Sequence, residues 1–185
     1  MNDFLHNAYE ILKPLFPKQF DENEWFTITI SLFVLFFFLY VHKKAHALLR
    51  TEIIAILLFN LLYTTVGDYF LAMDPYDFYD TVDHDSGELM DVLLQNIAYP
   101  FFLLILMHFY AKHKPNIVLS IAMGALLLYG LEWVSVEYFN LFTYKTWKPW
   151  YSLVFYIPVM ALNILFYHKF HQYVYRKISL KSASQ

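Results

Sequence analysis

The chain of 185 residues is 59% hydrophobic and 21% aromatic, and only 16% of its residues are charged. Soluble domains contain about a quarter charged residues, so too few polar side chains remain here to cover a water-soluble protein. The formal net charge of -3 provides no basic surface for a nucleic acid. The absence of Cys excludes a disulfide framework, a thiolate nucleophile and a Cys-ligated metal. We expect an integral membrane protein that is surrounded by lipid.

Residues 1–24 do not have the pattern of a secretory signal, because no basic region precedes an apolar stretch there. Apolar residues from Phe4 to Leu15 instead recur at helical spacing. This pattern predicts a short amphipathic helix at the membrane interface. An arm that packs against the bundle has equal support.

Five segments are long and apolar enough to cross about 30 Å of hydrocarbon, which takes a helix of roughly 20 residues. They are Trp25–Val41, Ile53–Ala72, Leu89–Ala111, Ile117–Phe139 and Trp150–Tyr167. The sequence therefore predicts an all-α bundle of five transmembrane helices. We place the amphipathic segment at 1–24, the transmembrane domain at 25–172 and a cytoplasmic tail at 173–185.

Prolines mark both the ends of helices and irregular points within them. Pro115-Asn116 and Lys148-Pro149 are typical of helix boundaries. Pro100 and Pro158 lie inside the third and fifth predicted spans, where neighbouring groups can satisfy the carbonyls that proline leaves free, so we expect kinks and not breaks.

Basic residues divide unevenly between the two ends of the predicted bundle, and they tend to remain in the cytoplasm. One end holds Lys43, Lys44, Arg50, Lys112, Lys114, Lys169, Arg176, Lys177 and Lys181; the other holds Lys13, Lys18, Lys145 and Lys148. The excess predicts a plasma-membrane protein with its N-terminus outside and its C-terminus in the cytoplasm.

Polar residues recur at helical spacing inside four of the spans, and in lipid such side chains face the bundle interior or a water-filled cavity. These stripes are Asn60, Thr64 and Asp68; Asp91, Gln95 and Tyr99; Ser120, Gly124, Glu132 and Ser135; and Ser152, Tyr156 and Asn163. They predict a polar interior.

Three of these residues are acids that fall in the outer half of their spans: Asp68, Asp91 and Glu132. No Lys or Arg lies inside a span to pair with them, and Lys145 and Lys148 are the available partners. A carboxylate away from water takes up a proton or recruits a cation. The acids therefore have three interpretations: protonated or hydrogen-bonded groups that join helices, a cation site, or a catalytic acid and base formed by Glu132 and Asp91.

The predicted outer loop at 74–88 is the most acidic part of the chain. Asp83, Asp85 and Glu88 resemble part of a calcium loop, although the bidentate Glu expected further on is absent. Oxygen ligands favour calcium or magnesium, and His84 leaves manganese or zinc open. We favour a solvated acidic loop over a divalent cation site, and we predict no other cofactor.

Aromatic residues such as Tyr144 and Trp147 gather in the next outer loop, where an aromatic belt at the membrane interface explains them. A lip that binds sugar or lipid is the less favoured alternative.

Two stretches, Leu89–Leu94 with Tyr99-Pro100 and Leu131–Trp133 with Phe142–Ser152, resemble a family of small, uncharacterised polytopic membrane proteins from spore-forming bacteria of the Bacillus and Clostridium kind. The similarity covers roughly residues 55–170. It implies a bacterial membrane protein but no named activity. The framework positions it implies are Asp91, Pro100, Glu132, Tyr144, Trp147 and Ser152.

The leading functional hypothesis is the binding, sensing or translocation of a small cationic or lipid-like ligand in an outward-facing acidic pocket. The expected lining is Asp68, Asp91, Gln95 and Glu132, with Asn60 and Ser135 orienting the carboxylates and Tyr99 and Tyr156 closing the pocket. The alternatives are an intramembrane enzyme that acts on a lipid or isoprenoid through Glu132 and Asp91, and a scaffold subunit that binds a membrane protein partner or a second copy of itself.

Overall fold

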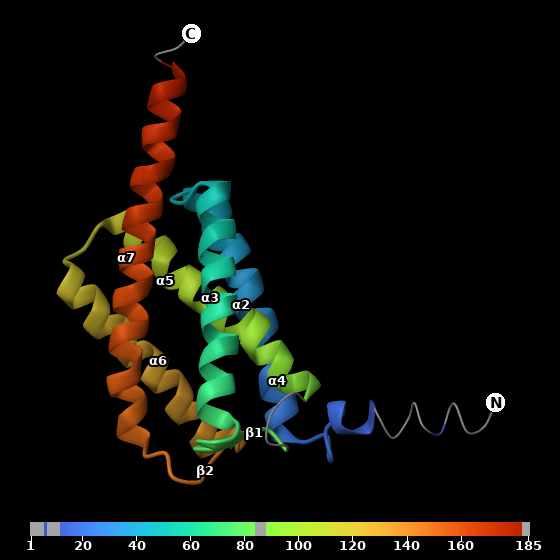
Figure 1. The fold of residues 1–185 in the computed structure, drawn as a ribbon. Helices are drawn as coiled ribbons and strands as arrows, with labels where there is room; N and C mark the ends of the chain where they lie inside the picture. Colours follow the sequence, from blue (N-terminus) through green and yellow to red (C-terminus); the bar gives the residue numbers. More distant parts are fainter. Residues whose placement is uncertain (1–5, 7–11, 84–87, 183–185) are drawn as a thin grey trace.

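The computed structural model describes residues 6, 12–83 and 88–182, and their arrangement is shown in Figure 1. In chain order the elements are η1 (Lys13–Leu15), α2 (Glu22–Ala45), α3 (Arg50–Ala72), β1 (Tyr79–Thr81), α4 (Leu89–Leu93), the π-helical turn η2 (Leu94–Ala98), α5 (Tyr99–His113), α6 (Ile117–Phe139), β2 (Phe142–Tyr144) and α7 (Pro149–Ser182). The segments α4, η2 and α5 form one continuous span over Leu89–His113. The predicted all-α bundle is confirmed.

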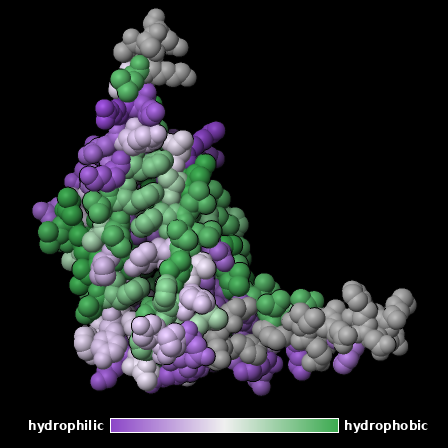
Figure 2. Space-filling view, in the orientation of Figure 1, coloured by the Kyte–Doolittle hydropathy of each residue, from purple (hydrophilic) through white to green (hydrophobic). Residues whose placement is uncertain are grey.

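Within the described residues, five helices are long and apolar enough to cross a membrane, as a multi-pass protein requires. Figure 2 shows hydrophobic residues along the sides of the molecule and hydrophilic residues toward its two ends. Large apolar side chains such as Phe36, Leu58 and Val118 are more than 60% exposed. Such exposure is unfavourable in water and suits a surface that faces lipid.

The two ends of the bundle differ in what they contain. The α2–α3 connection, the α5–α6 connection and the C-terminal end of α7 lie at one end, and β1, β2 and the start of α2 lie at the other (Figure 1). We call the second the ribbon end. The nine lysine and arginine residues that the sequence predicts at one end of the bundle therefore all lie toward the end that is opposite the ribbon end.

The first and the last of the five long helices, α2 and α7, extend beyond the spans predicted for them. Helix α2 begins at Glu22, where Asp21 and Glu24 form a reciprocal cap with the backbone. Helix α7 has 34 residues, which makes it about 50 Å long and longer than the hydrocarbon core. The tail predicted at 173–185 is thus helical to Ser182. Most of the amphipathic helix predicted within 1–24 lies outside the described residues, apart from the single turn η1.

The π-turn η2 lies just before Pro100, where a kink is predicted, and Pro158 lies inside α7, which continues past it. Pro100 has no N–H and its ring crowds the carbonyl four residues earlier, so regular α-helical bonding fails there. The N–H of Tyr99 instead donates to the carbonyl of Leu94, five residues back. Turns of this kind rotate the following side chains relative to the helix, and they occur often at functional sites.

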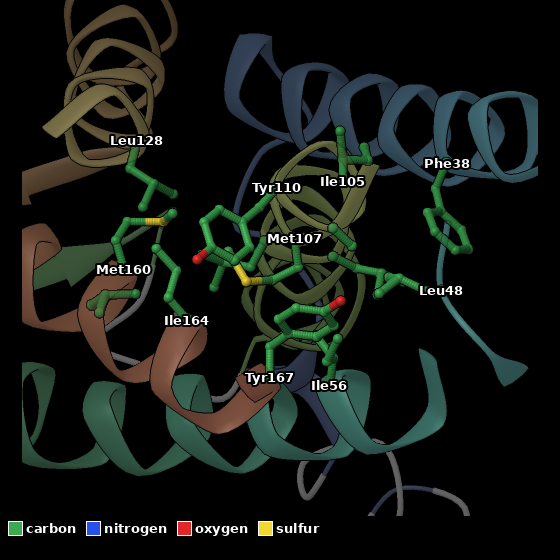
Figure 3. Packing of buried hydrophobic residues seen from close by; sticks show 14 of the residues in the cluster. Phe38, Leu48, Ile56, Ile105, Met107, Tyr110, Leu128, Met160, Ile164 and Tyr167 are labelled. Carbon is green, nitrogen blue, oxygen red and sulfur yellow. The ribbon is translucent and has the colours of Figure 1, made fainter. Parts of the chain in front are cut away.

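The apolar core surrounds α5. Its residues Leu104 and Met107 are fully buried, and Figure 3 shows Met107 and Tyr110 among side chains from α3, α6 and α7. Lipid is as apolar as these side chains, so close van der Waals contact, and not escape from water, favours this packing.

Helices α6 and α7 lie close together at Gly124. A Cβ atom placed there lies within 3 Å of the side chain of Met160. The absence of a side chain at Gly124 therefore allows the two helices to approach closely.

We expect Gly124→Leu to lower the stability of the protein by about 1–3 kcal/mol, because the added side chain overpacks the contact with Met160. The measurement is thermal unfolding in detergent micelles. Gly130→Leu on the same helix is the matched control, since a Cβ at Gly130 meets no atom within 4 Å. Equal melting temperatures for the two variants contradict the prediction.

Candidate functional site

A cavity of about 100 Å³ lies between α3, η2, α6 and α7, near the ribbon end. Its lining combines carboxyl groups, hydroxyl groups and aromatic rings. The lining residues are Tyr63, Thr64, Gly67, Asp68, Leu71, Tyr79, Asp91, Leu94, Gln95, Tyr99, Leu103, Leu128, Glu132, Phe142, Tyr144, Trp147, Ser152, Phe155, Tyr156 and Val159. An engineered cavity of about 150 Å³ accommodates benzene, so this one suits a group of slightly smaller size.

Six residues that the sequence placed in a pocket line this single cavity. They are Asp68, Asp91, Gln95, Tyr99, Glu132 and Tyr156. The stripe from Asp91 to Tyr99 faces the cavity because these residues share one side of a helical span. All three acids predicted in the outer half of the spans thus meet in space.

Glu132 is the most strongly hydrogen-bonded acid of the cavity. Its Oε1 accepts from the hydroxyls of Tyr144 and Ser152, each at 2.5 Å, and its Oε2 accepts from the hydroxyl of Tyr156. Ser152 Oγ in turn accepts from Trp147 Nε1 at 2.7 Å. Three donors on one carboxyl group suit its ionised form, which accepts hydrogen bonds only.

The phenols around this group remain protonated and can donate. Burial, followed by the charge of Glu132, raises the pKa of Tyr144, and burial followed by the charge of Asp68 raises the pKa of Tyr79 well above the usual range. Neither side chain ionises near neutral pH, so each keeps its hydrogen for the neighbouring carboxylate.

Asp91 and Asp68 are held differently. The side-chain nitrogen of Gln95 donates to both carboxyl oxygens of Asp91 at 2.9 Å. Asp68 accepts from Tyr79 over a long distance of 3.4 Å. Thr64 fixes α3 against η2 by donating to the backbone carbonyl of Gln95 at 3.0 Å.

The roles predicted for Asn60 and Ser135 are wrong. Asn60 donates to Asn163 at 2.8 Å and to the carbonyl of Ile56 at 3.0 Å, so it joins α3 to α7, and neither of these bonds involves a carboxylate. Ser135 donates to the backbone carbonyl of Glu132, not to its side chain. A helical stripe shows which face looks inward, but it does not show which inward partner a side chain meets.

Trp147 and Tyr144 reach the cavity and do not simply form an interfacial belt. Strands β1 and β2 pair antiparallel, with Tyr79 opposite Tyr144. The backbone N–H groups of residues 145–147 all donate to the carbonyl of Phe78, at 3.0–3.2 Å. These bonds fold the loop back onto the bundle. The short ribbon has no clear signal in the sequence, since it joins two loops more than sixty residues apart.

The cations expected near the acids lie elsewhere. Lys145 Nζ is 2.7 Å from Asp77 Oδ1 and 2.6 Å from Asp80 Oδ1, and these contacts raise the pKa of Lys145. In the part of the chain that the structure describes, neither lysine nor arginine lines the cavity. Three acidic side chains therefore face one small space whose described walls contain no lysine or arginine.

The acidic loop is only partly as predicted. Thr81, Val82 and Glu88 are buried, so a fully solvated loop is wrong. Asp83 accepts hydrogen bonds from the backbone N–H of Gln19 and, through its carbonyl, from Lys18. Asp85, the remaining predicted metal ligand, lies outside the described residues. Among the described residues, no group of three His, Asp or Glu side chains could hold a metal ion.

Comparison with known proteins gives no assignment: no protein-family model, curated protein or solved structure matches the chain.

Glu88 should make folding sensitive to pH. Burial, reinforced by the acidic groups of Asp83, Glu24 and Asp91, raises its pKa from 4.5 to about 7. At a pH between the pKa of 4.5 in the unfolded chain and the pKa of about 7 in the folded protein, Glu88 is ionised when unfolded and protonated when folded. The stability of the folded protein therefore falls as the pH rises from about 4.5 to 7. Glu88→Gln should remove this dependence and be more stable than the parent above pH 7, by about 1–3 kcal/mol.

The measurement is the melting temperature of both proteins in micelles across that pH range. A difference between them that does not change with pH contradicts the prediction.

Proposed function

We propose that the protein binds a small organic cation in the cavity between α3, η2, α6 and α7. The observation that carries the proposal is the lining: three carboxyl groups face a space of about 100 Å³ without a lysine or arginine among the described wall residues. Sensing or translocation of such a cation begins with the same binding step.

The aromatic walls support an organic cation. Tyr79, Trp147 and Phe155 surround one part of the cavity, and the face of such a ring attracts a cation most strongly where water is excluded. A cation held there interacts with the carboxylates and the rings together. The size of the space excludes a whole isoprenoid or acyl chain but accepts an ammonium-type headgroup.

The hydrogen bonds favour binding over acid–base catalysis by Glu132 and Asp91. Both carboxyl groups already accept hydrogen bonds from protein donors, three on Glu132 and one to each oxygen of Asp91. A general acid or base must instead direct its proton or a lone pair toward the substrate. Held in this way, the two groups act as fixed negative charges.

We further propose that the protein lies in a bacterial plasma membrane with the ribbon end outside. The excess of basic residues at the opposite end supports this orientation, because lysine and arginine tend to remain in the cytoplasm. The cavity then draws its ligand from outside the cell or from the outer leaflet.

The absence of native Cys permits a direct test of this orientation. Thr143→Cys places a thiol at an exposed position of β2, and Ser179→Cys places one at an exposed position of α7. In intact cells a membrane-impermeant maleimide should label only the first variant, and permeabilised cells should show both labelled. The reverse pattern overturns the orientation.

Ligand binding is tested by thermal unfolding of the purified protein with choline or ethanolamine. A ligand at 100 times its Kd stabilises the folded state by about 2.7 kcal/mol, which is a shift of several degrees. We expect at least one of the two cations to produce it. Glu132→Gln should abolish the shift because it removes a fixed negative charge from the wall.

Gly67→Leu tests the cavity without changing a charge. A Cβ at Gly67 meets no atom within 4 Å, so the new side chain extends into the open space and should also abolish the shift. Gly130→Leu lies outside the lining and should retain it. If neither cation stabilises the parent protein, or if Gly67→Leu retains the full shift, the proposal is wrong.

A further inference from the structure

The acids of the cavity offer charge but few open hydrogen-bond acceptors. Glu132 accepts from Tyr144, Ser152 and Tyr156, and both oxygens of Asp91 accept from Gln95. Asp68 differs, since the hydrogen bond that it accepts is 3.4 Å long. A ligand that enters therefore meets acidic groups whose acceptor positions are largely used by the protein itself.

Aromatic rings also line the cavity. The ring of Trp147 lies 6.1 Å from that of Tyr79 and 6.4 Å from that of Phe155, nearly perpendicular to the second. Trp147 is also fixed through Nε1 by the hydroxyl of Ser152, which is bonded to Glu132. The same chain of hydrogen bonds thus holds both a charge and a ring at the cavity.

We propose that the cation is a quaternary ammonium group, as in choline, and not a protonated primary amine. This inference rests on the proposed binding function. A primary ammonium group carries three N–H donors, and burial without acceptors costs it free energy. A trimethylammonium group has no N–H to satisfy, and it gains from nearby negative charge and from ring faces. The described walls supply negative charge and aromatic rings, and of their three acids only Asp68 accepts no short hydrogen bond.

The group can reach the cavity as free choline or as the headgroup of a lipid. Both carry the same trimethylammonium group, and the two sources are separated by the membrane used in the assay. In nanodiscs of phosphatidylglycerol, free choline should bind in either case. In nanodiscs of phosphatidylcholine, it should bind unchanged if free choline is the ligand and should be excluded if the headgroup already occupies the cavity.

The decisive experiment is calorimetric titration of the purified protein in phosphatidylglycerol nanodiscs with choline, with ethanolamine and with 3,3-dimethylbutan-1-ol, the uncharged isostere of choline. We expect choline to bind at least ten-fold more tightly than either of the others. Tighter or equal binding of ethanolamine overturns this inference and leaves cation binding in place. Equal binding of the uncharged isostere overturns it too, and absence of binding by all three overturns the proposed function as well.

Trp147→Leu should weaken choline binding roughly ten-fold and change ethanolamine binding less, since loss of a ring face matters most to the ligand that depends on it. Trp133→Leu is the matched control, because Trp133 is 48% exposed and does not line the cavity. If Trp147→Leu unfolds without ligand, Phe155→Leu provides the same test at the neighbouring ring of the lining. Unchanged choline affinity in a folded variant of either kind contradicts the inference.

Discussion

The constraint on which this structure depends is the cost of placing the carboxyl group of Glu132 inside an apolar bundle. A charged group in that position is tolerated only with hydrogen-bond donors around it, since lipid offers none. The protein supplies three hydroxyls from the ribbon and α7. Because Tyr144, Ser152 and Tyr156 all converge on one residue of α6, the carboxylate fixes the ribbon and two helices relative to one another.

The polar residues inside the bundle divide into two groups with different consequences. Asn60 donates a hydrogen bond to Asn163, and this bond joins α3 to α7. Nearer the ribbon end, the acids are satisfied by donors from their own or adjacent elements and remain on the wall of a cavity. A polar group in a membrane bundle can therefore join two helices or line a cavity. Which of the two it does depends on the position of its hydrogen-bond partner.

The ribbon connects the outer loops to this arrangement. Lys145, bound by Asp77 and Asp80, keeps its charge at the edge of the ribbon, so it does not neutralise the acids of the cavity. The π-turn before Pro100 contributes from the other side, since it lies between Asp91 and Tyr99, which both reach the cavity. Features that interrupt regular helices are thus concentrated at the proposed binding site.

From its sequence alone, this protein is determined to be a bundle of five apolar helices, because length and hydropathy are local properties that lipid selects strongly. Helical spacing also placed Asp68, Asp91 and Glu132 on inward faces. The donors that meet each acid depend on contacts between distant segments. Asn60 and Ser135 bond to other partners, while Tyr144 and Trp147 reach the cavity from a loop. The position of that loop depends on the pairing of β1 with β2, which are far apart in the chain. The periodicity of a single helix or strand does not predict such a contact.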